Sequence, residues 1–357
     1  MLNEPYQPKR RPGCSEIFAY FEFLSLGIMG DGLSVGDEGY FLNIKCHERP
    51  ITEVKFNYDG DLIFTAGKDS TATLLRADGS VIGEYKGHRG SIFSIAIDNK
   101  SDALMTGSAD QSIILWDVPT GKVKAQADVG VVVKGLDFYR DGTLCLVCSD
   151  DSMGKTSLVG MFDTRSKDFR KVLTPASSPV KVLLDASEDF LVYCDSKGSI
   201  SSVDLRNLQT IKSARIHTSK INNIRPSRCR TFFITGSTDS QSKIVDFLDL
   251  SVQKTFVCEE PVNCAAIFNT NDKVICVGGI NARDVTTTKG KSSFEANFFD
   301  VVTCEKIGSY STHFGTINSV DVHPSGKLYC SGGEEGTVTI LAFAQDFFKA
   351  NFTGFNN

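Results

Sequence analysis

The feature that most constrains this chain is the segment 87–117, which recurs along the sequence in weaker copies. It reads GHRGSIFSIAIDNKSDALMTGSADQSIILWD, so that Gly87-His88 opens it and Trp116-Asp117 closes it. Between these ends lie three short runs with the composition of β-strands, separated by polar turns. A unit of this kind that recurs about every 40–45 residues is typical of one small antiparallel sheet in a ring of sheets.

The copies can be counted through the histidines, because four of the five occupy the Gly-His position of the repeat, although only His88 keeps the glycine: His47, His88, His217 and His313. The first two are 41 residues apart, which is one repeat, and 129 residues separate the second from the third, which is three repeats of 43. The last interval is longer than two repeats because 280–293 is an insertion in the sixth unit. The count is seven, so the sequence predicts an all-β fold, a seven-bladed WD-repeat β-propeller.

The expected domain boundaries follow the ends of this repeat. The run 40–45, YFLNIK, precedes the first blade and is expected to pair with the last one, closing the ring. We expect the propeller over 40–348 and a C-terminal tail over 349–357. Residues 1–39 do not fit the repeat, and we expect an irregular N-terminal extension that is disordered or loosely docked. Its basic start and short apolar run are similar to a secretory signal, but no small-residue cleavage site follows.

Composition narrows the class of protein. The formal net charge is −5 and the pI is about 5.6, which argues against a surface that grips bare nucleic acid through its phosphates. No run of eighteen apolar residues is present, so we expect no membrane span. Eleven cysteines are scattered through strand-like runs, which favours a reducing compartment and a cytoplasmic location. We expect no cofactor and no metal.

One set of polar residues in the second blade is expected to be structural. His88 can bridge the carboxylate of Asp110 and a strand hydroxyl, from Thr106 or Ser108, which can in turn accept the indole N–H of Trp116. We expect His88, Ser108, Asp110 and Trp116 to form this tetrad. The same residue types could form a Ser-His-Asp hydrolase site. A catalytic set would not recur at blade spacing, so a non-enzymatic protein is expected.

Other candidate motifs are weaker. In the seventh blade, Glu334 is expected at the position of the tetrad aspartate. Cys145 and Cys148 could suggest a zinc site, but residues three apart on a strand face opposite sides and no second pair lies nearby. We therefore expect both cysteines to be buried as small apolar side chains.

Several motifs are more specific than the repeat itself. They are ARDVTTT at 282–288, FEANFF at 294–299, HFGTIN at 313–318, SGGEEG at 331–336 and CHERPIT at 46–52. Over about residues 41–348 the chain resembles subunit I of eukaryotic translation initiation factor 3, a family of seven-bladed WD-repeat propellers. It departs from that family's pattern at Asn297, where an arginine is usual, and residues 1–39 have no counterpart.

The resemblance implies a non-enzymatic scaffold within the initiation factor complex, which supports recruitment of mRNA and initiator tRNA to the small ribosomal subunit. It implies contacts with the B and G subunits, the carboxy-terminal helix of the B subunit docking on blades five and six. The partner-binding positions that we map are Asn223, Asp239, Arg283 and Asp284. The alternative is a WD-repeat adaptor of another assembly, such as a ubiquitin ligase or a signalling scaffold, which would share every feature except the motifs of blade six.

Overall fold

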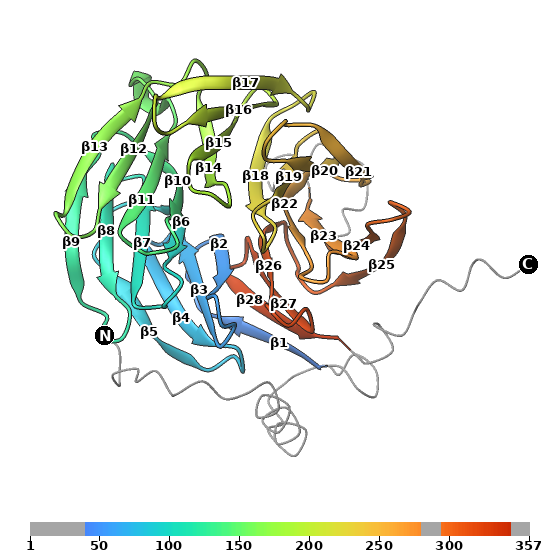
Figure 1. Ribbon diagram of the computed structural model, residues 1–357. Helices are drawn as coiled ribbons and strands as arrows, with labels where there is room; N and C mark the ends of the chain where they lie inside the picture. The colour runs from blue at the N-terminus through green and yellow to red at the C-terminus, as the bar shows by residue number, and fades with distance from the viewer. Residues whose placement is uncertain (1–39, 280–293, 344–357) are drawn as a thin grey trace, which may run out of the picture.

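The structure, a computed structural model, describes residues 40–279 and 294–343. These residues form seven four-stranded antiparallel sheets arranged as blades around a central axis (Figure 1). The predicted all-β, seven-bladed propeller is therefore confirmed. The predicted extension 1–39, the blade-six insertion 280–293 and the tail 349–357 lie outside the described residues.

The strands of each blade follow one another in the chain. Blades one and two contain β2 (Ile51–Phe56), β3 (Leu62–Gly67), β4 (Thr71–Arg76), β5 (Val81–Lys86), β6 (Ile92–Ile97), β7 (Ala103–Ser108), β8 (Ser112–Asp117) and β9 (Val123–Asp128). Blades three and four contain β10 (Val133–Phe138), β11 (Leu144–Ser149), β12 (Leu158–Asp163), β13 (Asp168–Leu173), β14 (Pro179–Leu184), β15 (Phe190–Asp195), β16 (Ser199–Asp204) and β17 (Gln209–Arg215). A short 3-10 helix, η1 (Ser152–Gly154), interrupts blade three.

The last three blades complete the ring. Blades five and six contain β18 (Ile221–Pro226), β19 (Phe232–Ser237), β20 (Gln241–Asp246), β21 (Val252–Val257), β22 (Val262–Ile267), β23 (Lys273–Gly278), β24 (Glu295–Asp300) and β25 (Lys306–Ser311). Blade seven contains β26 (Ile317–Val322), β27 (Leu328–Gly333), β28 (Thr337–Ala342) and the chain's first strand, β1 (Tyr40–Lys45). No helix in the described ranges is long and apolar enough to cross a membrane.

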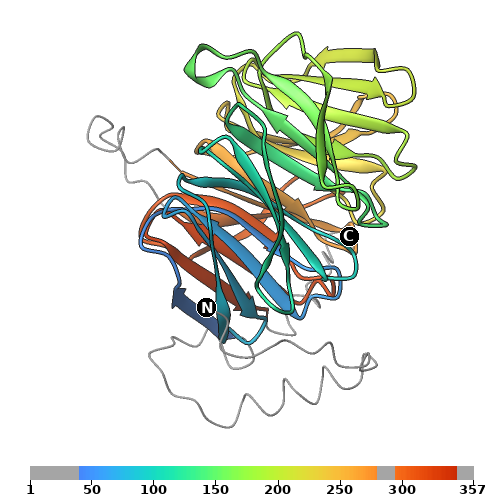
Figure 2. The ribbon, with the colours of Figure 1, turned by 90° about the vertical axis from the view of Figure 1, so that its left-hand side faces the viewer.

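Strand β1 closes the ring as predicted. It pairs antiparallel with β28 from Tyr40 opposite Ala342 to Lys45 opposite Thr337. In both views the blue strand β1 lies beside the red strands of blade seven (Figure 1 and Figure 2). Without β1 the outer edge of β28 would have unpaired backbone N–H and C=O groups, and β1 provides their hydrogen-bond partners.

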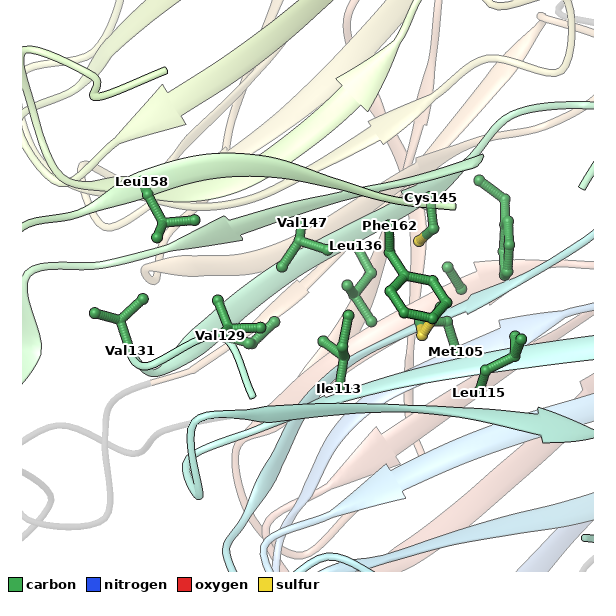
Figure 3. Close-up of a cluster of buried hydrophobic side chains, with 13 residues drawn as sticks. Met105, Ile113, Leu115, Val129, Val131, Leu136, Cys145, Val147, Leu158 and Phe162 are labelled. Atoms are coloured by element: carbon green, nitrogen blue, oxygen red, sulfur yellow. The ribbon is translucent and has the colours of Figure 1, made fainter. Parts of the chain in front are cut away.

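The hydrophobic core lies between neighbouring blades, because the middle strands of each blade are buried on both faces. One cluster joins Met105, Ile113 and Leu115 of blade two to Val147 and Phe162 of blade three (Figure 3). The outermost strands are covered on one face at most, and every residue of β17 except Ala214 is exposed. The blades thus support one another rather than folding around a single centre.

Two faces of the ring are used below. The histidine face carries the loops that enter the central strands, together with the turns between second and third strands. The turn face is the opposite one, and it carries the turns between first and second strands and between third and fourth strands. Each central strand has a register shift just after its first residue, as between Ile51 and Glu53 in β2, and such bulges redirect the side chains that follow.

Candidate partner interface

The polar set of blade two forms a continuous hydrogen-bonded chain. The Nδ1 atom of His88 lies 2.9 Å from the carboxylate of Asp110, and its Nε2 atom lies 2.8 Å from the hydroxyl of Thr106. The indole N–H of Trp116 donates to the same hydroxyl at 2.9 Å. The chain connects the histidine loop to the second and third strands and so fixes how they meet.

Burial and hydrogen bonding determine the protonation states of His88 and Asp110 in this hydrogen-bonded set. Burial lowers the pKa of His88, although Asp110 opposes the shift. Burial acts to raise the pKa of Asp110, but hydrogen bonds from the Arg89 N–H and the Ser112 hydroxyl outweigh it and lower that pKa to about 2. A neutral imidazole therefore donates from Nδ1 to the carboxylate, and its Nε2 accepts from Thr106. All members are satisfied within the blade, which suits a structural role.

The tetrad hydroxyl is Thr106, and the expected Ser108 has another role. Ser108 donates to the carbonyl of Gly90 at 2.9 Å and accepts the N–H of Asp110 at 3.1 Å. It stands at the end of β7, beyond the reach of Trp116, which is paired with Leu104. Ser108 thus anchors the loop, whereas Thr106 completes the chain.

The same arrangement recurs in three other blades. His47 contacts Asp69 and Thr65, and His217 contacts Asp239 and Thr235, through the same ring atoms. In blade seven the imidazole of His313 contacts Ser331 at 2.8 Å and the carboxylate of Glu335. The expected residue, Glu334, instead forms an ion pair with Lys68 at 3.5 Å. Among the described residues, no group of three or more His, Cys, Asp or Glu is arranged to hold a metal ion.

The mapped partner-binding residues of blade five are already engaged. Asn223 lies in the central strand β18, is 5% exposed, and donates to the thiol of Cys264 in blade six at 3.3 Å. Asp239 accepts from His217 and from the N–H groups of Thr218 and Gln241. Arg283 and Asp284 lie outside the described residues. Binding of partners by these four residues stays a prediction.

An apolar surface that sequence reasoning missed lies on the outer edge of blades five and six. Leu248 is 75% exposed and Val302 is 76% exposed, and both stand in the turns that lead to the outermost strands. Val252, at the start of β21, is also exposed. The Lys254 ammonium in β21 donates to the carbonyl of Val302 at 2.9 Å and so joins the outermost strand of blade five to the turn of blade six. We call Leu248, Val252 and Val302 the rim patch.

The rim patch is built by the same turn that other blades use. The N–H groups of Leu248 and Val302 each donate at 2.8 Å to the aspartate that ends the preceding strand. The equivalent N–H groups in blades three and four belong to Arg165 and Arg206. The turn therefore projects an apolar side chain only where the sequence supplies one. Comparing residues two positions after each strand-ending aspartate would have found the patch.

Comparisons with known proteins agree with this geometry. The family model EIF3I matches residues 41–353. Eukaryotic translation initiation factor 3 subunit I of Xenopus tropicalis is 36% identical over 315 residues, covering 86% of this chain and 97% of that protein. The Homo sapiens subunit I is 35% identical with the same coverage. Among solved structures, the β-propeller domain of Cps50 (Swd1) from Myceliophteria thermophila superposes with a TM-score of 0.72 at 17% identity. The superposition covers 84% of this chain and 98% of that domain. At this level of identity the likeness supports the fold alone.

Proposed function

The chain belongs to the family of subunit I of eukaryotic translation initiation factor 3, and we propose that it is a non-enzymatic scaffold of that complex. Membership of the complex and a role in translation initiation follow from the family. The proposal adds that the chain binds the B and G subunits directly, in the cytoplasm. Through them it supports recruitment of mRNA and initiator tRNA to the small ribosomal subunit, without reading nucleic acid sequence itself.

The observation that carries the scaffold role is the concentration of exposed apolar side chains on blades five and six. Ten large hydrophobic residues of the described chain are exposed, and four of them belong to these two blades: Leu248, Val252, Val257 and Val302. Leu248, Val252 and Val302 lie at the turn-face end of these blades, whereas Val257 lies at the other end of β21, opposite Gln241. Exposed apolar groups that gather at one edge mark interaction sites. An amphipathic helix laid along the rim patch would cover it with its apolar face.

The rim patch, rather than the residues mapped earlier, is proposed as the main contact with the helix of the B subunit. Asp239 already accepts hydrogen bonds from its own blade, and Asn223 is buried at the centre of the ring. The rim side chains have no such commitments, and burying them would remove apolar area from water. Asp239 stays a candidate for a secondary contact on the histidine face.

Affinity purification tests this function. A tagged full-length chain expressed in eukaryotic cells and recovered at mild salt should bring with it the B and G subunits and small ribosomal subunits. Mass spectrometry of the eluate identifies them. Recovery of none of these proteins, or of the subunits of a ubiquitin ligase or signalling assembly in their place, would contradict the proposal.

A further inference from the structure

A cavity of about 420 Å³ lies at the centre of the ring, on the turn face. Its walls are the ends of the seven central strands, which Figure 1 shows around the axis, and the turns that follow them. The volume lies in the range of small-ligand sites. The cavity is separate from the rim patch. It is lined by the innermost strand of each blade, whereas the rim patch lies beside the outermost strands.

The inner wall of this cavity holds more positive than negative charge. Lys55 and Glu53 of blade one lie 3.3 Å apart, and Lys181 of blade four reaches across the channel to the same carboxylate at 3.0 Å. Glu53 is 2% exposed. Two ammonium groups therefore share one carboxylate in a site that is largely shielded from water. Their other hydrogen bonds go to neutral acceptors, the carbonyl of Ile95 for Lys55 and the hydroxyl of Ser94 for Lys181, so one carboxylate faces two positive charges.

A buried guanidinium on the same wall is only partly satisfied. Arg225 is 6% exposed. One of its terminal nitrogens donates to the carbonyl of Val54 at 2.7 Å and to the hydroxyl of Ser319 at 2.9 Å. Asp321 lies 3.6 Å from the other, beyond hydrogen-bond distance. The Nε–H makes no hydrogen bond of acceptable geometry among the described residues, and the Cys264 thiol is the other polar group that interacts with this guanidinium. Buried donors of this kind are rare and are expected to have an acceptor.

The mouth of the cavity adds two exposed arginines. The guanidinium of Arg228 stacks 4.7 Å above the ring of Tyr58, which is itself half exposed. Arg140 lies in the first turn of blade three and is also exposed. Six basic side chains line the cavity against four acidic ones, in a chain whose formal net charge is −5: Lys55, Arg140, Lys181, Arg225, Arg228 and Arg230. Arg230 is already paired with Asp137 through two hydrogen bonds of 2.6 and 3.0 Å, so the excess of positive charge rests on the other five.

We propose that this cavity binds a compact polyanion that carries two or more phosphate groups, such as an inositol polyphosphate. Arginine and lysine are the side chains that recognise phosphate oxygens, and the arginine fork donates two hydrogen bonds to one group. Basic side chains lie both on the inner wall and at the mouth of the cavity, so they could contact different phosphate groups of one small molecule. The proposal is independent of the rim patch and of the scaffold role.

Calorimetric titration of the purified full-length chain with inositol hexakisphosphate is the first test. We expect saturable 1:1 binding that weakens as salt is raised. The double variant Arg140→Ser/Arg228→Ser should bind at least ten-fold more weakly, because both arginines are exposed and their loss leaves the fold intact. The control Arg165→Ser removes an exposed arginine from the outside of blade three and should bind like the parent chain.

The thiol of Cys229 supplies a second readout, because it is exposed between Arg228 and Arg230. Bound polyanion should slow its alkylation, measured by peptide mapping, in the parent chain but not in the double variant. Inorganic phosphate alone should bind at least ten-fold more weakly than the hexakisphosphate. The proposal is overturned if no binding or protection is seen, or if the control variant loses as much affinity as the double variant. Equal affinity for inorganic phosphate, or tighter binding of a doubly phosphorylated peptide, would also overturn it.

Discussion

Thr106 holds two buried nitrogen atoms of its blade at once. Its hydroxyl lies 2.8 Å from the imidazole of His88 and 2.9 Å from the indole nitrogen of Trp116. Ser108 serves only backbone groups at the edge of the blade. The two hydroxyls should therefore contribute differently to the free energy of unfolding, although both belong to strand β7.

Replacing Thr106 by valine, which keeps the shape, should lower the free energy of unfolding by about 2–4 kcal/mol. Two buried polar groups lose their partner, and each orphaned group costs about 1–3 kcal/mol. Ser108→Ala should cost about 1 kcal/mol, because one ordinary hydrogen bond is lost. Urea unfolding of both variants measures the difference, and an equal or larger loss for Ser108→Ala would contradict the assignment.

At the residue scale, sequence reasoning found the histidines and tryptophan but misjudged their partners. Thr106 and Ser108 are two positions apart on one strand, so alternation places them on the same face and cannot choose between them. Spacing could have chosen. In all four histidine blades the hydroxyl follows its histidine by 18 residues and the carboxylate by 22, which selects Glu335 over Glu334.

His323, the histidine outside the repeat position, should make the fold sensitive to acid. Burial lowers its pKa from 6.5 to about 4. Its Nδ1 accepts the N–H of Ser325 at 2.9 Å, and a proton there would displace this bond. The native state thus resists a proton that the unfolded chain accepts, so the stabilisation is complete above pH 6.5 and is lost as the pH falls towards 4.

This histidine should contribute up to about 3 kcal/mol to the fall in unfolding free energy between pH 7 and pH 4, since one pKa unit corresponds to about 1.4 kcal/mol. In His323→Asn, whose side chain does not titrate, the fall over this range should be smaller by that amount. Urea unfolding at a series of pH values measures both curves. Parallel curves for the two proteins would contradict this prediction, because they would mean that His323 takes up protons equally in the folded and unfolded states.

At the scale of elements, the neighbouring residues Ile44 and Asn43 of strand β1 lie in opposite environments. Ile44 packs with Val338 and Ile340 in the cluster between blades seven and one, whereas its neighbour Asn43 is exposed. Ile44→Asp should therefore destabilise the chain by about 2–4 kcal/mol through an unpaired charge in apolar surroundings. Asn43→Asp should change stability by less than about 0.5 kcal/mol. Thermal unfolding compares the pair, and equal midpoints would mean that β1 does not close the ring.

The inner strands were predictable and the outer ones were not, for a physical reason. Strands such as β3 and β7 are buried along most of their length and read as apolar runs. The outer strands β9 and β17 have little covered surface, so selection for apolar side chains at alternate positions is weak there. Strand β1 was predicted because a ring needs an edge partner, an argument from topology rather than from local pattern.

At the scale of the whole molecule, the family and the fold were predictable from the blade-six motifs and the histidine spacing, but the surfaces were not. The rim patch depends on single residues in turns, Leu248 and Val302, which carry no periodicity. The channel depends on contacts between distant blades, such as Lys181 with Glu53. Contacts separated by 128 residues cannot be seen in any local pattern.

The most direct test of the scaffold account is quantitative recovery of the B subunit with the double variant Leu248→Asp/Val302→Asp. The matched control is Val81→Asp/Val123→Asp, which alters two half-exposed valines on the outer strands of blades one and two. Tagged chains with matching thermal unfolding midpoints are purified from cells, and the B subunit is measured by mass spectrometry. We expect the rim variant to recover at least ten-fold less B subunit than the parent, and the control to recover as much as the parent. Equal recovery by the rim variant and the control would contradict docking on blades five and six.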